Sequence, residues 1–189
     1  FFHEVWPYAL GALCITIFYR ADTLMLQAMK GEDVVGDYRY AFVLFETLFL
    51  IPQTVALAAY PAISAMTGAG MPTGPFLGGL ARIFVLISLP LTVGGWIVGD
   101  GLMTILFPNG LQAHAIWRLL VWALPFVYGN FLLGTALTAS GHQKMNLVAS
   151  SIMAVGNLIL NVALIPRWGA GGAALAAGIT QMMYCLLLG

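Results

Sequence analysis

Polar residues recur at regular intervals within the first apolar stretch of the sequence. Their spacing of four, three, four and three residues is set by Thr16, Arg20, Thr23, Gln27 and Lys30. Such spacing places all five side chains on one helical face, which we call the polar stripe. In a membrane span, a charged group at mid-depth costs about 2.5–3.5 kcal/mol, so each is a candidate for function. We expect the polar stripe to line a hydrated cavity; a buried network that joins helices is the alternative.

Arg20 and Asp22 are the charged residues nearest the middle of this stretch. Arg20 lies about 4.5 Å along the helix axis from the midpoint of residues 5–29, too deep to reach water along its own stem. Asp22 points roughly 200° away from Arg20, so the two cannot pair on the surface of one helix. Asp22 therefore needs a partner on another helix, or a proton.

A second polar row has seven-residue spacing and includes a carboxylate within the next apolar stretch. The row consists of Arg39, Glu46, Gln53 and Tyr60. Glu46 could pair with Arg20 or titrate as a coupling group, and the sequence leaves both open. Arg82 and Arg118 fall nearer the ends of apolar stretches, where long cationic side chains reach the lipid headgroups.

Small, amide and aromatic residues indicate how the helices pack. Asn157 and Asn161 share a face at i and i+4, which favours hydrogen bonds between helices. Close helix approach is expected at glycines with four-residue spacing, namely Gly70, Gly74, Gly78, Gly95 and Gly99. Interfacial positions are expected for the aromatic residues near the ends of the stretches: Trp6, Tyr38, Tyr40, Tyr60, Trp96, Trp117 and Trp168.

The composition excludes an ordinary soluble domain. Hydrophobic residues make up 61% of the 189 positions and charged residues 7%, at a net charge of zero. A typical soluble domain has about 25% charged residues. With no basic face, binding to nucleic acid is not expected. Cys14 and Cys185 both sit in apolar stretches, where a small polarizable side chain packs well.

The apolar stretches have the length of membrane-spanning helices, roughly 20 residues for a hydrocarbon core of about 30 Å. They predict an all-α bundle of about six spans in one unit, 1–189, near 5–29, 40–66, 76–98, 115–139, 146–165 and 173–189. Pro52, Pro90 and Pro125 lie inside spans and predict kinks. The chain begins at Phe1 without a signal-peptide pattern, and we expect it to be an excerpt of a longer protein.

Several short motifs follow one another in a fixed order. They are Arg20-Ala21-Asp22-Thr23-Leu24-Met25-Leu26 with Gly31; Val35-Gly36-Asp37-Tyr38 with Ala41; Pro52 and Tyr60-Pro61; Phe107-Pro108-Asn109-Gly110; Ser140-Gly141-His142-Gln143-Lys144; Asn157-Leu158-Ile159-Leu160-Asn161; and Ile165-Pro166-Arg167-Trp168-Gly169-Ala170-Gly171-Gly172-Ala173-Ala174. In this order and spacing the sequence resembles the second half of the polysaccharide or lipid-linked oligosaccharide flippases, in the multidrug/oligosaccharidyl-lipid/polysaccharide (MOP) exporter superfamily.

The resemblance implies two six-helix lobes that face each other across a central cavity, with this chain as the C-terminal lobe and an N-terminal lobe of the same chain as its partner. The implied substrate is a polyprenyl diphosphate oligosaccharide or peptidoglycan precursor, moved across a bacterial cytoplasmic membrane by alternating access. Arginine suits the diphosphate because its planar fork donates two parallel hydrogen bonds.

The resulting site predictions fall into two groups. The substrate-binding candidates are Arg20, Thr23, Gln27, Arg39 and Arg118. The coupling or gating candidates are Asp22 and Glu46, with sodium or protons as the coupling ion. No cofactor, metal site or catalytic residue is expected.

Two other functions compete with a lipid-linked sugar flippase. A drug or cation antiporter of the same superfamily would use carboxylates and aromatic residues for cationic substrates, and Arg20 argues against it. A membrane enzyme acting on a lipid phosphate would need converging acid, base or metal-binding groups. His3, His114 and His142 are scattered, and the cluster of Glu32, Asp33 and Asp37 reads more simply as charges near a helix start.

Overall fold

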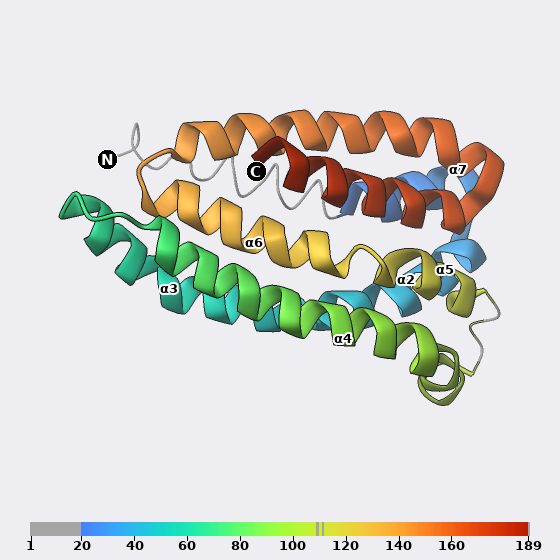
Figure 1. Cartoon of the computed structure of the whole chain (residues 1–189). Helices are drawn as coiled ribbons and strands as arrows, with labels where there is room; N and C mark the ends of the chain where they lie inside the picture. The colour runs from blue at the N-terminus through green and yellow to red at the C-terminus, as the bar shows by residue number, and fades with distance from the viewer. Residues whose placement is uncertain (1–19, 109, 111, 189) are drawn as a thin grey trace, which may run out of the picture.

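The protein, seen here in a computed structural model, is described over residues 20–108, 110 and 112–188, and the regular secondary structure in these ranges is entirely helical. A helix over residues 20–30 precedes six others (Figure 1): α2 (Glu32–Thr47), α3 (Leu50–Gly68), α4 (Gly74–Leu106), α5 (Ala113–Val121), α6 (Leu124–Ala139) and α7 (Gln143–Leu188). The all-α prediction is therefore confirmed. Thr16 of the polar stripe and Cys14 lie outside the described residues.

The long helices have the length and composition of membrane spans. Among the described residues three helices qualify, over Val34–Gly68, Gly74–Leu106 and Gln143–Leu188, and the bent pair α5 and α6 adds a fourth when it is taken as one span. Their outer faces are apolar, with Ile105 79%, Ile97 76% and Leu57 73% exposed. An outer surface of this kind suits lipid, while the helices satisfy their own backbone hydrogen bonds.

Several helices extend beyond the predicted spans, which corrects two of the connectors expected between those spans. Residues 30–39 were expected to form a connector, but α2 begins at Glu32, directly after Gly31 with its φ of 90°. Similarly, α4 continues into the connector expected at 99–114 and ends at Leu106. Polar residues end an apolar stretch without ending a helix, because the helix continues into the headgroup region.

Two spans are broken where the sequence predicted kinks. Leu48 and Phe49 separate α2 from α3, and a bend of 48° separates α5 from α6. Pro52 and Pro125 each lie in the first turn of the helix that follows the break, where the missing N–H is tolerated. By contrast, α4 runs through Pro90 as one helix.

α7 folds back on itself into two arms, seen in orange and red in Figure 1. The turn is at Gly169, with φ 55° and ψ −130°, so the predicted connector 166–172 is helical except at this glycine. The arms touch directly: a Cβ on Gly172 would lie 2.4 Å from the Leu164 carbonyl oxygen. Lys30 Nζ donates to the carbonyl of Pro166, at 2.9 Å, close to the break. A carbonyl near a helix end is thereby satisfied from outside the helix.

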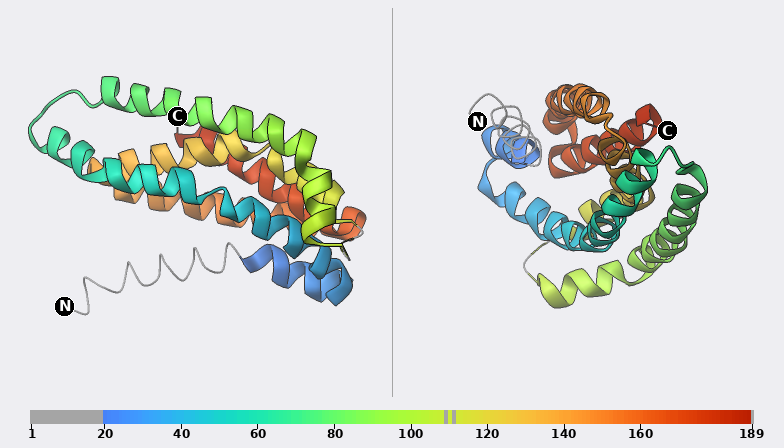
Figure 2. Two further views of the ribbon diagram at one scale, coloured as in Figure 1. Left: turned by 90° about the horizontal axis from the view of Figure 1, so that it is seen from below. Right: turned by 90° about the vertical axis from the view of Figure 1, so that its left-hand side faces the viewer.

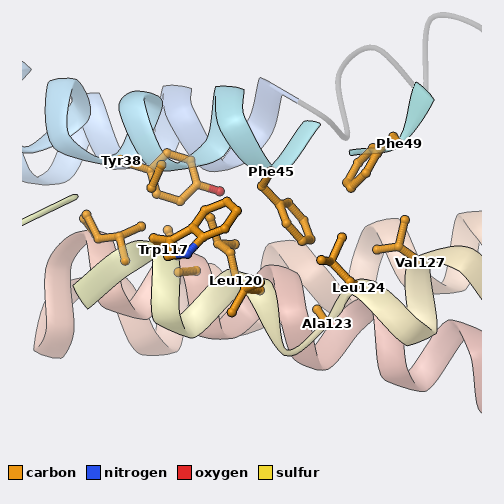
Figure 3. Close-up of a cluster of buried hydrophobic side chains, with 14 of the residues drawn as sticks. Tyr38, Phe45, Phe49, Trp117, Leu120, Ala123, Leu124 and Val127 are labelled. Carbon is orange, nitrogen blue, oxygen red and sulfur yellow. The ribbon is translucent and has the colours of Figure 1, made fainter. Parts of the chain in front are cut away.

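The core lies around α5 and α6, and α6 contacts α3, α4 and α7. Figure 3 shows part of this core, including Tyr38, Phe45, Trp117 and Leu124. Tyr38 is fully buried and Trp117 is 2% exposed, so the interfacial positions predicted for these two aromatic residues are wrong. Each has a buried partner for its polar atom, which removes the need for the wet membrane surface.

The glycine ridges divide into one that packs and one that does not. Trp117 lies against Gly95 and Gly99: its Nε1 donates to the Gly95 carbonyl at 2.8 Å, and a Cβ on Gly99 would lie 2.0 Å from that nitrogen. A Cβ added at Gly70, Gly74 or Gly78 would meet nothing within 4 Å. The close approach predicted there is wrong, and Gly70 serves a turn with φ of 68° instead.

Candidate functional site

Asp22 is a buried carboxylate held by two other helices. Its side chain comes from the helix over 20–30, and the residue is 5% exposed. The Tyr38 hydroxyl of α2 donates to Oδ2 at 3.1 Å, and Asn161 Nδ2 of α7 donates to Oδ1 at 2.5 Å. The sequence required a partner on another helix or a proton, and the structure supplies two partners. Without such donors, burial of this polar group would be costly.

The network continues from Asp22 across both arms of α7. Asn161 Nδ2 also donates to Asn157 Oδ1 at 2.9 Å, and Asn157 Nδ2 donates to Thr180 Oγ1 at 3.3 Å. The predicted interhelical role of the two asparagines is therefore confirmed. Thr180 donates in turn to the Ala176 carbonyl at 2.7 Å. The helix over 20–30, α2 and both arms of α7 are thus joined through one polar cluster.

Sequence reasoning missed Tyr38 and Thr180 as members of this cluster. Tyr38 was assigned to the interface because it lies near polar residues at the start of an apolar stretch. Thr180 stands alone in an alanine-rich segment, with no periodic polar partner nearby. A buried hydroxyl in lipid needs a hydrogen bond, which is the one signal that could have found it.

A cavity adjoins the cluster, and one oxygen of the cluster is buried without a hydrogen-bond partner. The cavity measures about 20 Å³ and is lined by Asp22, Phe42, Phe45, Phe49, Asn157, Ala177 and Gln181. This volume is enough for about one water molecule. Asn161 Oδ1 is buried without a partner. The site is therefore an oxygen-rich point inside an otherwise apolar bundle.

The oxygen atoms of this cluster suit a hard cation or a proton. The cluster contains a carboxylate, two amide oxygens and a hydroxyl, and oxygen ligands are those that hard cations prefer. Among the described residues, no three His, Cys, Asp or Glu side chains come together as a metal site. The cluster could therefore hold a monovalent cation through Asp22, Asn157, Asn161 and Thr180, or a proton on Asp22.

The described part of the polar stripe lies on the opposite face of the same helix. Arg20, Gln27 and Lys30 are exposed and Thr23 is half-buried, whereas Asp22 and Leu26 are buried. In the right-hand view of Figure 2 this helix lies at the edge of the bundle, beside α2. One face of the helix thus packs against the bundle, and the face with Arg20 is open.

The remaining predicted site residues are exposed and do not join Asp22. Glu46 and Arg39 lie on the surface of α2. Both ion pairs within the described ranges contain Asp100, so Glu46 is not paired with Arg20. Arg118 pairs with Asp100 and lies over the Trp96 ring at 5.8 Å. Arg118 is therefore already matched by a carboxylate of α4.

Comparison with known proteins finds similarity to flippases in both sequence and structure. The sequence is 25% identical over 177 residues to the probable flippase AglR of Haloferax volcanii, covering 88% of this chain and 36% of AglR. The fold matches the lipid II flippase MurJ in an inward closed conformation with a TM-score of 0.83, at 17% identity over 99% of this chain and 41% of MurJ. No family model matches the sequence.

Both matched proteins are flippases, which are transporters and not enzymes. The chain spans about two fifths of their length. Its distant homology to AglR and its MurJ-like fold agree with the resemblance carried by the motifs. The chain is therefore a multi-pass membrane protein that is distantly similar in sequence to part of one flippase and shares the fold of part of another.

Proposed function

We propose that the chain forms the C-terminal lobe of a flippase that moves a lipid-linked oligosaccharide or peptidoglycan precursor across the cytoplasmic membrane by alternating access. The observation that carries this proposal is the open polar face at Arg20 and Gln27, on a helix whose other face is packed. A polar face is not stable against lipid tails, so it needs water or a second lobe opposite. Two lobes facing each other would enclose such a hydrated cavity.

Arg20 would hold the diphosphate of the substrate, with Thr23 and Gln27 on the same face. Its guanidinium is exposed and forms no ion pair with a described residue, so its donors are available for phosphate oxygens. Arg39 is exposed as well and could assist. Arg118 would first have to share or release Asp100, which makes it the weaker candidate.

Asp22 would couple transport to sodium or protons. Asn161 supports this proposal because its amide nitrogen contacts the carboxylate while its amide oxygen is buried without a partner, and a buried polar atom of this kind calls for a ligand. Asp22 and Arg20 lie on opposite faces of the helix over 20–30. A change of occupancy at Asp22 would therefore alter how the helix is held, and with it the position of Arg20. Glu46 remains a gating candidate on the surface of α2.

The location within the cell follows from the same proposal. The prediction of a bacterial inner membrane is narrower than the comparisons support, because AglR comes from an archaeon. The proposed flippase acts in the cytoplasmic membrane of either kind of cell, where lipid-linked sugars are assembled on one side and used on the other.

The test replaces Arg20 in the complete transporter, in cells that depend on it for export of a lipid-linked sugar. Arg20→Ala should lower turnover of the lipid-linked intermediate roughly 10- to 100-fold, as expected for losing charged hydrogen bonds worth about 1.5–3 kcal/mol. Arg82→Ala is the matched control, because Arg82 is also exposed but lies on α4, away from the polar stripe. Asp22→Asn should remove the dependence of turnover on sodium or pH.

Equal turnover in the Arg20→Ala and Arg82→Ala variants would end the substrate assignment. Export of organic cations that is lost in Asp22→Asn but unaffected by Arg20→Ala would favour the antiporter alternative instead. Both variants should be compared at equal amounts in the membrane.

A further inference from the structure

Two broken spans run side by side, with their breaks at the same level. α2 packs against α5, and α3 packs against α6, so the two spans run in the same direction. The breaks fall at Leu48–Phe49 in one span and Trp122–Ala123 in the other. Figure 3 shows Phe45 and Phe49 of the first span facing Leu124 and Val127 of the second. The two breaks are thus packed against each other.

A side chain of the second span satisfies the backbone of the first at its break. In a continuous helix, the Leu48 carbonyl would accept from the N–H four residues later, but that residue is Pro52, which has none. The Tyr128 hydroxyl donates to the Leu48 carbonyl at 3.2 Å. Tyr128 is 1% exposed, and its ring meets Phe84 edge to face at 5.7 Å. Its position is therefore fixed by packing, and it can hold Leu48 in place.

The Leu48 carbonyl belongs to a segment that lines the cavity beside Asp22. Phe45 and Phe49 flank Leu48 in sequence, and both line that cavity. Their rings meet edge to face with 4.9 Å between centroids, and the ring of Phe49 packs in the same way against Phe131 of α6, with 6.2 Å between centroids. Any movement of Leu48 relative to α6 therefore moves the aromatic wall that faces the carboxylate.

We propose that Tyr128 is a positioning residue for the coupling site: through Leu48 it holds Phe45 and Phe49 in the wall of the cavity that Asp22 also lines. This inference rests on the proposed coupling role of Asp22. The tyrosine does not touch the ion site itself. It fixes the break of the first span against the second, so that the cavity has the same shape whenever the cation or proton arrives.

The experiment measures how NaCl and pH stabilise the purified complete transporter against thermal unfolding, with choline chloride keeping the ionic strength constant. The wild type gives a midpoint for sodium or for pH, and Asp22→Asn should abolish it. Tyr128→Phe keeps the ring but removes the donor, and it should shift the sodium midpoint, or the proton concentration at the pH midpoint, by about three- to tenfold. Tyr184→Phe removes another interhelical hydroxyl bond, to Asn146, and should stay within about twofold.

A second variant separates positioning from simple stability. In Tyr128→Phe combined with Pro52→Ala, residue 52 regains an N–H that can bond the Leu48 carbonyl. The unfolding temperature without cation should recover, because the carbonyl is satisfied again. The sodium or pH midpoint should stay shifted, because a helix that is continuous through residues 48–52 holds Phe45 and Phe49 in different positions.

The outcomes decide the inference in each case. An unchanged midpoint in Tyr128→Phe, or a midpoint that returns with Pro52→Ala, overturns it, since the tyrosine would then act on stability alone. A wild type without any sodium or pH response, or a response that survives Asp22→Asn, overturns the coupling role of Asp22, and this inference falls with it.

Discussion

Gly172 lies where the backbones of the two arms of α7 approach closely, and Gly172→Ala should be strongly destabilising. The added Cβ would lie 2.4 Å from the Leu164 carbonyl oxygen, 2.6 Å from its carbon and 3.0 Å from the Ile165 nitrogen. All three are backbone atoms, so no rotation of a side chain can relieve the overlap. The arms must separate, and overpacking of this kind costs about 1–3 kcal/mol.

The assay is equilibrium unfolding of the purified protein in mixed micelles, followed by tryptophan fluorescence as the fraction of denaturing detergent rises. Gly156→Ala and Gly171→Ala are matched controls on the two arms. A Cβ at Gly156 meets nothing within 4 Å, and one at Gly171 lies 3.5 Å from Leu119 Cδ1, an ordinary contact. Because alanine favours a helix over glycine by up to about 1 kcal/mol, both controls should match or exceed the wild type in stability. If Gly172→Ala unfolds together with Gly156→Ala, the close packing of the arms is refuted.

Two further substitutions test how the spans are joined. Trp117→Phe loses the indole donor to the Gly95 carbonyl and should lower the free energy of unfolding by about 1–3 kcal/mol. Trp168→Phe, at an exposed position, is the control and should change this free energy little. Similar losses for the two variants in the same micelle assay would refute the buried role of Trp117. Lys30→Met keeps the apolar stem but leaves the carbonyl at the α7 break without its donor, and should cost up to about 1 kcal/mol because the contact is exposed; the exposed Lys144→Met is its control, and equal stability of the two variants would contradict a capping role for Lys30.

Much of the fold could be predicted because lipid restricts what a chain can do. With no water to satisfy the backbone, apolar stretches of this length must be helices, and the all-α prediction followed. The lengths were less accurate. The start of α2 at Glu32 and the end of α4 at Leu106 were missed, because hydropathy records where the hydrocarbon ends and not where the backbone hydrogen bonds stop.

Packing was predicted less well than secondary structure. Tyr38 and Trp117 have the side-chain type and the sequence position of interfacial anchors, yet both are buried with partners for their polar atoms. The glycines near residue 70 have the spacing of a packing ridge, yet space around them is open. Such patterns describe one helix at a time, and the helix that lies opposite decides whether a ridge is used.

Asp22 shows most clearly which features the sequence determines and which ones depend on the tertiary structure. The sequence by itself determined that this carboxylate lies in a helix, that it points away from Arg20, and that it needs a partner elsewhere, because helical periodicity fixes directions around one axis. Only the tertiary structure decided that the partners are Tyr38 and Asn161, which lie 16 and 139 residues away along the chain. The same holds for the open face at Arg20: its polarity is written in the residue spacing, but its exposure depends on which neighbours cover the helix. The physical reason is that the helices are set by local backbone hydrogen bonds, whereas the site forms from side chains that only the packing of distant helices brings together.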